Sequence, residues 1–183
     1  MKLWGYTKSD AVGIAFVLAI TMAAGWFINC ERGRRLPLRY QTAAERMEAV
    51  VREIGTEHDG RRPVSDHVNS DTEITLVDFK AIVRFSKSWV VDARPAVFHR
   101  LGHVPGALSL PRNNFASAYE AIKTELEKNR HRPIVVYCSG EACADSELVC
   151  GALQKLGYTN LAIFRGGWSE WTAAGLPEEK GRS

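Results

Sequence analysis

The chain has few cysteines and no recognisable cofactor motif. Four cysteines among 183 residues do not indicate a disulfide framework, which a chain of this length does not need. There is no G-x-G-x-x-G after an apolar run, no phosphate-binding loop with its lysine, and no Cys and His cluster that offers four zinc ligands. We therefore expect no bound cofactor and no metal.

Charge of one sign is also scarce. The formal net charge is +3, and the basic residues do not gather into a stripe with interleaved aromatics, so no nucleic-acid partner is expected. With 45% hydrophobic and 25% charged residues, the composition is that of a globular protein with one domain and an appendage.

One stretch has no charge at all. No charged residue falls between Asp10 and Glu31, and the run AVGIAFVLAITMAAGWFINC would reach about 30 Å as a helix. It is longer than the apolar core of a signal peptide, about 7–15 residues. Aromatic residues near its ends are typical of membrane interfaces: Trp4, Tyr6 and Trp26. We predict a single-pass transmembrane anchor over residues 1–30 and a location in the cell membrane.

The distribution of Lys and Arg mildly favours a cytoplasmic soluble domain. The basic residues are Lys2 and Lys8 before the run, and Arg32, Arg34, Arg35 and Arg39 after it. Alanine recurs at every fourth position from Ala11 to Ala23, which would allow a weak homodimer of such helices, although alanine is common in membrane helices in any case.

Residues 31–69 are predicted to connect the anchor to a domain. Within them, TAAERMEAVVREIG has apolar residues at helical spacing and a capping-box pattern at Thr42 and Glu45. Its apolar face either packs on the domain or lies on the membrane surface. The stretch TEHDGRRPVSDHVNSDTE is polar and rich in turn formers, which indicates a linker.

From Ile74 onward, short apolar runs alternate with helical patterns. The predicted strands are SWVVDAR, GALSLP, PIVVYC and NLAIFRGG, and the predicted helices are LVDFKAIVRF, SAYEAIKTELEKN, DSELVCGALQKLG and GWSEWTAAG. This alternation predicts an α/β domain with a mostly parallel sheet covered on both faces. Ligands bind such sheets at the carboxyl ends of the strands, beside helix N-termini.

Cys138 occupies that position. It ends the run PIVVYC, and the loop 139–145 leads into the helix that starts near Asp145. Amide groups at a helix N-terminus stabilise a thiolate, and small residues at Ser139, Gly140 and Ala142 let backbone amides form an anion cradle. The pattern indicates a nucleophilic cysteine, whereas Cys150 in the following helix is expected to be a buried thiol.

Two segments resemble the rhodanese-like (thiosulfate sulfurtransferase-like) domain family. The resemblance covers about residues 70–178, and residues 179–183 are expected to form a tail. The two segments are VVDARPAVFHRLGHVPGALSLP and VVYCSGEACADSELVCGALQKLGYTNLAIFRGGWSEWTAAGLP. The positions that carry the resemblance are Asp92, Arg94, Gly102, His103, Pro105, Gly106, Ala107, Cys138, Gly166, Gly167, Trp168 and Trp171. The resemblance implies a three-layer sandwich around a mostly parallel five-stranded sheet. It also implies that Cys138 takes sulfane sulfur from a small-molecule or protein-borne donor and passes it from a persulfide to a thiol acceptor.

The active-site loop departs from the family pattern. Its residues are Ser139, Gly140, Glu141, Ala142, Cys143, Ala144 and Asp145. Catalytic rhodaneses commonly have an arginine where this chain has Cys143, and the phosphatase relatives have one where it has Ala144. Without the donor fork of an arginine, phosphatase activity is not expected, and a neutral or protein-borne sulfur donor is accommodated more easily than thiosulfate.

Cys143 has two interpretations. It is either a resolving thiol that attacks a persulfide or sulfenic acid on Cys138, or a side chain that packs under the loop. The resemblance gives Asp92 and Arg94 structural or electrostatic roles near the site, and His103 is expected to orient a loop. Arg165 either replaces the missing loop arginine or pairs with a carboxylate.

Three functions remain open from the sequence. The favoured one is a membrane-anchored rhodanese-like sulfurtransferase that works through Cys138, because the nucleophile is present. The missing arginine favours a catalytically silent binding module with the rhodanese fold. A thiol redox sensor would use Cys138 and Cys143 equally.

Overall fold

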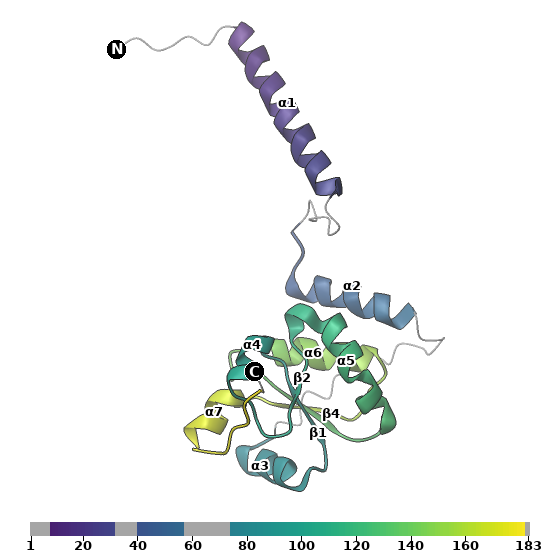
Figure 1. Cartoon of the computed structure of the whole chain (residues 1–183), viewed down its shortest axis with the longest axis vertical. Helices are drawn as coiled ribbons and strands as arrows, with labels where there is room; N and C mark the ends of the chain where they lie inside the picture. The colour runs from purple at the N-terminus through teal and green to yellow at the C-terminus, as the bar shows by residue number, and fades with distance from the viewer. Residues whose placement is uncertain (1–7, 32–39, 57–73, 182–183) are drawn as a thin grey trace. The chain divides into compact units, whose positions relative to one another are not determined.

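The computed structural model describes residues 8–31, 40–56 and 74–181 (Figure 1). The chain divides into two compact units, Met1–Gln41 and Thr42–Ser183. In the first unit, helix α1 (Lys8–Glu31) contains the span Ala11–Cys30, which is long and apolar enough to cross a membrane. One such helix near the N-terminus supports the predicted anchor only weakly. The arginines used to predict its orientation lie outside the described residues.

The second unit is built on a parallel sheet. Its strands are β1 (Trp89–Asp92), β2 (Leu108–Ser109), β3 (Ile134–Tyr137) and β4 (Leu161–Phe164), in the order β2-β1-β3-β4. All three pairings are parallel. The prediction of five strands is wrong for the part of the chain that the structure describes, which forms four. From Ile74 onward the sequence has four short apolar runs of strand character, and each of them contains one of these strands.

Helices cover both faces of the sheet, and the alternating strand residues separate two cores. On one face, Val91 and Val136 pack with α5 (Phe115–Lys128) and α6 (Asp145–Lys155). On the other face, Val90 and Val135 pack with α3 (Leu76–Phe85) and α7 (Gly167–Ala173). Because successive side chains of a strand point to opposite faces, β1, β3 and β4 each contribute side chains to both cores, and the three-layer arrangement follows.

Helix α2 (Ala43–Thr56) belongs to the first of these cores. The predicted capping box is confirmed, since Thr42 N–H donates to Glu45 Oε2 at 2.7 Å and Glu45 N–H donates to Thr42 Oγ1 at 3.2 Å. Its apolar face is buried through Met47, Val51 and Ile54, which join the cluster of α5 and α6. Of the two fates expected for this face, packing on the domain is the one observed.

Two short helical segments follow the first two strands. Helix α4 (Ala96–Leu101) comes after β1, and the 3-10 helix η1 (Arg112–Asn114) comes after β2. The sequence analysis predicted neither, because segments of 6 and 3 residues are too short to show an apolar period. Both start near the carboxyl edge of the sheet, where Cys138 also lies.

Candidate active site

Cys138 follows the last residue of β3 at the carboxyl edge of the sheet. The parallel register pairs Asp92 with Tyr137, so the chain leaves β1 and β3 at the same edge. Cys138 is buried, with 2% of its surface exposed to solvent. The loop from Ser139 to Ala144 then leads to the first residue of α6, Asp145, as the sequence predicted.

Helix α7 holds the start of this loop. Trp168 N–H donates to the Cys138 carbonyl at 2.8 Å, and Ser169 N–H donates to the Ser139 carbonyl at 2.9 Å. Gly167 has φ +59°, and a Cβ atom on it would lie 2.5 Å from the Cys138 carbonyl oxygen and 2.8 Å from Gly140 N. Both the left-handed backbone and the close approach therefore require glycine at this position.

Cys138 and Cys143 are joined by a disulfide, with their Cα atoms 6.2 Å apart. A tight turn brings them together, because Cys143 N–H donates to the Gly140 carbonyl at 3.0 Å. The Cys143 carbonyl accepts a hydrogen bond from Ser146 Oγ at 3.4 Å. Cys143 is half-buried, and the Ser139 hydroxyl lies 4.0 Å from Cys138 Sγ. The loop thus places the two sulfurs in bonding contact.

An ion pair lies beside the sulfurs. Arg112 Nε donates to Asp145 Oδ1 at 2.5 Å, and both side chains are about one quarter exposed. The Sγ atoms of Cys138 and Cys143 and a carboxylate oxygen of Asp145 all lie within 4.8 Å of one another. The sequence analysis missed Arg112. Its position directly after Pro111, where β2 leaves the carboxyl edge, was the available signal.

The remaining predicted loop and cation residues lie at the surface. Glu141, Ala142 and Ala144 are exposed. Arg165 Nη1 donates to Glu147 Oε1 at 2.8 Å in a solvent-exposed pair. Arg165 is therefore a partner of a carboxylate in the first turn of α6, one of its two expected roles.

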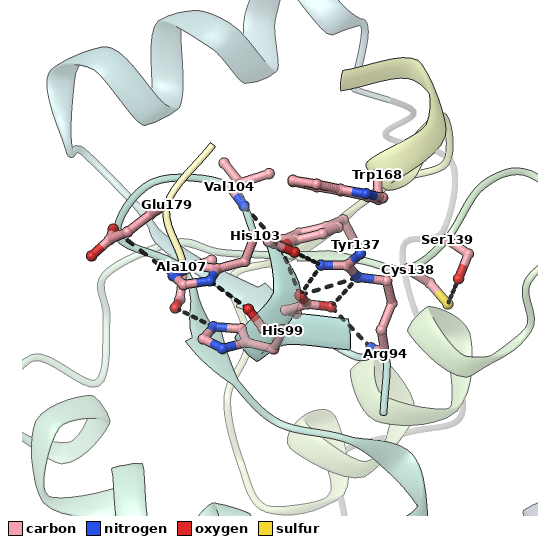
Figure 2. A network of polar contacts seen from close by, with 12 residues as sticks. Arg94, His99, His103, Val104, Ala107, Tyr137, Cys138, Ser139, Trp168 and Glu179 are labelled. Atoms are coloured by element: carbon pink, nitrogen blue, oxygen red, sulfur yellow. Dashed lines mark hydrogen bonds and ion pairs between the residues drawn. The ribbon is translucent and has the colours of Figure 1, made fainter. Parts of the chain in front are cut away.

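A buried polar network lies beside the cysteine (Figure 2). The Asp92 carboxylate accepts hydrogen bonds from four donors: the Arg94 backbone N–H at 3.0 Å, Arg94 Nε at 3.0 Å, Arg94 Nη2 at 2.7 Å and the Tyr137 hydroxyl at 2.9 Å. Arg94 Nη2 also donates to the Gly102 carbonyl at 2.7 Å. The guanidinium carbon lies 4.5 Å from the centroid of the Trp168 ring, which comes from α7. The network joins β1, β3 and α7 around the base of the loop.

Burial and the contacts within the network set the protonation states of Arg94 and Tyr137. Burial lowers the pKa of Arg94, but the hydrogen bonds and the charge of Asp92 together raise it by more. The net effect is a raised pKa, so the guanidinium stays charged. Burial, followed by the charge of Asp92, raises the pKa of Tyr137, which therefore stays a neutral donor. Burial raises the pKa of the Cys150 thiol to about 11, which suits the packing role expected for it.

His103 contacts helix α4 and the C-terminal segment. Its Nδ1 lies 2.7 Å from the His99 carbonyl oxygen, and its backbone exchanges two hydrogen bonds of 2.9 Å with Glu179 (Figure 2). Its ring stacks on the His99 ring with centroids 3.7 Å apart. His99 Nε2 in turn lies 2.9 Å from the Ala107 carbonyl oxygen. These contacts fit a loop-orienting side chain.

These features define the class of the protein: an α/β domain with a cysteine at the carboxyl end of a parallel strand, in a loop held by the helices that follow it. The chain belongs to the rhodanese-like domain family, which matches residues 75–174. This match contains Cys138, the whole loop and the sheet.

Curated relatives include sulfurtransferases. A putative thiosulfate sulfurtransferase of Synechococcus elongatus is 31% identical over 141 residues, which are 61% of this chain and 43% of that protein. The 3-mercaptopyruvate sulfurtransferase of Escherichia coli is 32% identical over 171 residues, 85% of this chain and 55% of that protein. The chain thus spans about half the length of these relatives.

Solved structures share the fold. A crystal structure of a Bacillus halodurans protein superimposes with a TM-score of 0.52 at 24% sequence identity, covering 59% of this chain and 76% of that one.

Proposed function

We propose that the chain is a membrane-anchored sulfurtransferase in which Cys138 carries sulfane sulfur as a persulfide to a thiol acceptor. The observation that carries the proposal is the position of Cys138 at the end of β3, in a loop that α7 holds and that leads into α6. The amides at the start of α6 favour an anionic sulfur there. The sulfurtransferase names of the relatives support the same chemistry.

The reaction has two displacement steps. The Cys138 thiolate attacks the sulfane sulfur of the donor, and the bond between that sulfur and the rest of the donor breaks, so the donor residue leaves with the bonding pair. The acceptor thiolate then attacks the outer sulfur of the persulfide, and the Cys138 thiolate leaves. The acidic side chains of Glu141 and Asp145 lie at the loop, so a neutral or protein-borne donor suits the site better than a dianion.

The anchor is part of the proposal. Helix α1 would span the bilayer once, with the domain on the cytoplasmic side, and would pair weakly with a second copy. The test is to separate membranes from expressing cells and wash them at alkaline pH. Retention of the full chain, together with digestion of the domain only after the cytoplasmic face is exposed to protease, is expected. Release of the chain by the wash would contradict the anchor.

The test of sulfur transfer is intact mass after a sulfane donor is added. The full chain would be reduced in detergent, freed of reductant, and treated with thiosulfate, benzenethiosulfonate or a persulfide donor. Sulfur uptake is expected in Cys143→Ser and in the matched control Cys30→Ser/Cys143→Ser, and its absence is expected in Cys138→Ser. If no donor loads the Cys143→Ser protein, the transferase proposal fails, and a silent binding module remains.

A thiol redox couple is the second candidate, favoured by the Cys138–Cys143 disulfide. It predicts that a peroxide oxidises both thiols without any sulfur donor, and that either Cys138→Ser or Cys143→Ser abolishes the response. A quantitative thiol assay before and after peroxide separates it from the transferase.

A further inference from the structure

The position of Cys143 is set by contacts that do not involve its sulfur. The turn bond to the Gly140 carbonyl and the hydrogen bond from Ser146 Oγ fix its backbone, and the two bonds from α7 fix the other end of the loop. None of these bonds requires the disulfide. In the reduced loop these bonds would hold the Cys143 thiol next to Cys138, where any sulfur carried on Cys138 would meet it.

We infer that Cys143 is the first acceptor in the cycle: its thiolate attacks Cys138 Sγ in the persulfide and displaces hydrosulfide, and an external thiol then reopens the resulting disulfide at Cys143. The inference rests on the proposed function, because it begins with the Cys138 persulfide. It adds a product, hydrosulfide, and a co-substrate, a thiol.

The atoms and electrons of the step balance. The bond between Cys143 Sγ and Cys138 Sγ forms, the bond between Cys138 Sγ and the outer sulfur breaks, and the outer sulfur leaves as HS⁻ with its proton. The sulfane sulfur is reduced by two electrons, and the two thiols are oxidised to the disulfide. Attack on the inner sulfur is the outcome that the loop favours, since the sulfurs bonded in the structure are the two Sγ atoms themselves.

Exposure decides which sulfur an external thiol attacks. Cys138 is 2% exposed, whereas Cys143 is half-buried. Disulfide exchange requires in-line access to the attacked sulfur, so the external thiolate bonds to Cys143 and Cys138 leaves as a thiolate. The leaving sulfur lies at the loop that precedes the N-terminus of α6, where negative charge is favoured. A second external thiol then releases Cys143, and Cys138 is ready for another donor.

The first experiment measures hydrosulfide and thiols together. The reduced full chain in detergent receives benzenethiosulfonate under anaerobic conditions, with no small-molecule thiol present. This donor gives up its sulfane sulfur and leaves as a sulfinate, so it does not act as the acceptor thiol. Wild type is expected to release about one equivalent of hydrosulfide per chain, lose two thiols and then stop; addition of 2-mercaptoethanol restarts the release. The Cys143→Ser protein is expected to keep its sulfur on Cys138, and Cys30→Ser is expected to behave as wild type.

The outcomes separate the two proposals. If wild type and Cys143→Ser both hold the added sulfur and neither releases hydrosulfide, the inference is overturned while the transferase stands. If Cys143→Ser takes up no sulfur from this donor or from the others tested above, the transferase fails and the inference fails with it.

The second experiment locates the attacked sulfur. The oxidised full chain is treated briefly with 2-mercaptoethanol, quenched with acid, alkylated and mapped by mass spectrometry. The mercaptoethanol adduct is expected on Cys143 and the alkyl group on Cys138. The reverse distribution would overturn the assignment of Cys143 as the entry point for the external thiol.

Discussion

Gly167 approaches Cys138 so closely that a Cβ atom on the glycine would lie 2.5 Å from the cysteine carbonyl oxygen. Substitution Gly167→Ala should therefore push the start of α7 away from the loop, weaken the Trp168 and Ser169 hydrogen bonds, and slow sulfur uptake at Cys138 by more than about tenfold. The rate of persulfide formation, followed by intact mass in a Cys143→Ser background, measures the effect.

Gly175 provides the matched control. It also has a positive φ, +63°, but no atom lies within 4 Å of a Cβ built on it. Gly175→Ala should cost about 1–2 kcal/mol of unfolding free energy from backbone strain and leave the rate of sulfur uptake unchanged. Equal rates in the two variants would show that the contact with Cys138 has no effect on the chemistry.

The Asp92–Arg94 pair should be important for stability. Arg94→Met would leave the Asp92 carboxylate buried without its cation, which costs about 3–5 kcal/mol for a buried pair. The Asp92→Asn/Arg94→Met double variant should recover part of this loss, because it removes the unpaired charge. Chemical denaturation of the full chain measures both, and a single variant as stable as wild type would contradict the assignment.

Arg112 should offset the unfavourable effect of the Asp145 charge on the thiolate and so on persulfide formation. Arg112→Gln leaves the carboxylate unpaired within 4.8 Å of both sulfurs, where it opposes a thiolate. We expect persulfide formation to slow about 2–5 fold, the range of a partly exposed ion pair, and to recover in the Arg112→Gln/Asp145→Asn double variant. Arg165→Gln is the control, because its pair with Glu147 is more exposed, and its rate should stay near that of wild type.

His99 should make the domain less stable in acid. Burial lowers its pKa, and the charge of His103 lowers it further, against the opposing effect of the hydrogen bond with the Ala107 carbonyl. The unfolded state therefore binds more protons than the folded state once the pH falls below about 6.5, the ordinary pKa of histidine. The contribution of neutral His99 to the free energy of unfolding is therefore present above that pH, and it is lost as the pH falls through the lowered pKa of the folded state.

The measurement is the free energy of unfolding at pH 7.5 and at pH 5.5, in wild type and in His99→Gln. The difference between the two pH values should be smaller in the variant, since the remaining groups titrate in both proteins. An identical difference in the two proteins would show that His99 does not contribute.

The regular elements could be predicted because each has a local signal. The four strands lie within short, mainly apolar runs bounded by turn residues, and the capping box at Thr42 and Glu45 marks the start of α2. The fifth strand rested on the family resemblance alone, with no apolar run to support it, and the described residues do not contain it.

The site was predicted only in part, because its contacts join segments distant in sequence. Cys138 could be found from its place at a strand end. The pairing of Arg112 with Asp145 depends on the order β2-β1-β3-β4, which brings η1 beside α6 and which no local pattern encodes. The requirement for glycine at 167 arises in the same way, from the backbone of a loop 29 residues earlier.

The packing of helix α2 on the domain determines where the chain can be truncated without exposing its core. The family match begins at residue 75, yet Met47, Val51 and Ile54 fill part of the core formed by α5 and α6. A fragment cut at the family boundary would present that apolar surface to water, and its tendency to aggregate would be mistaken for a property of the domain. The shortest well-behaved soluble fragment should begin before Thr42, so that the capping box survives.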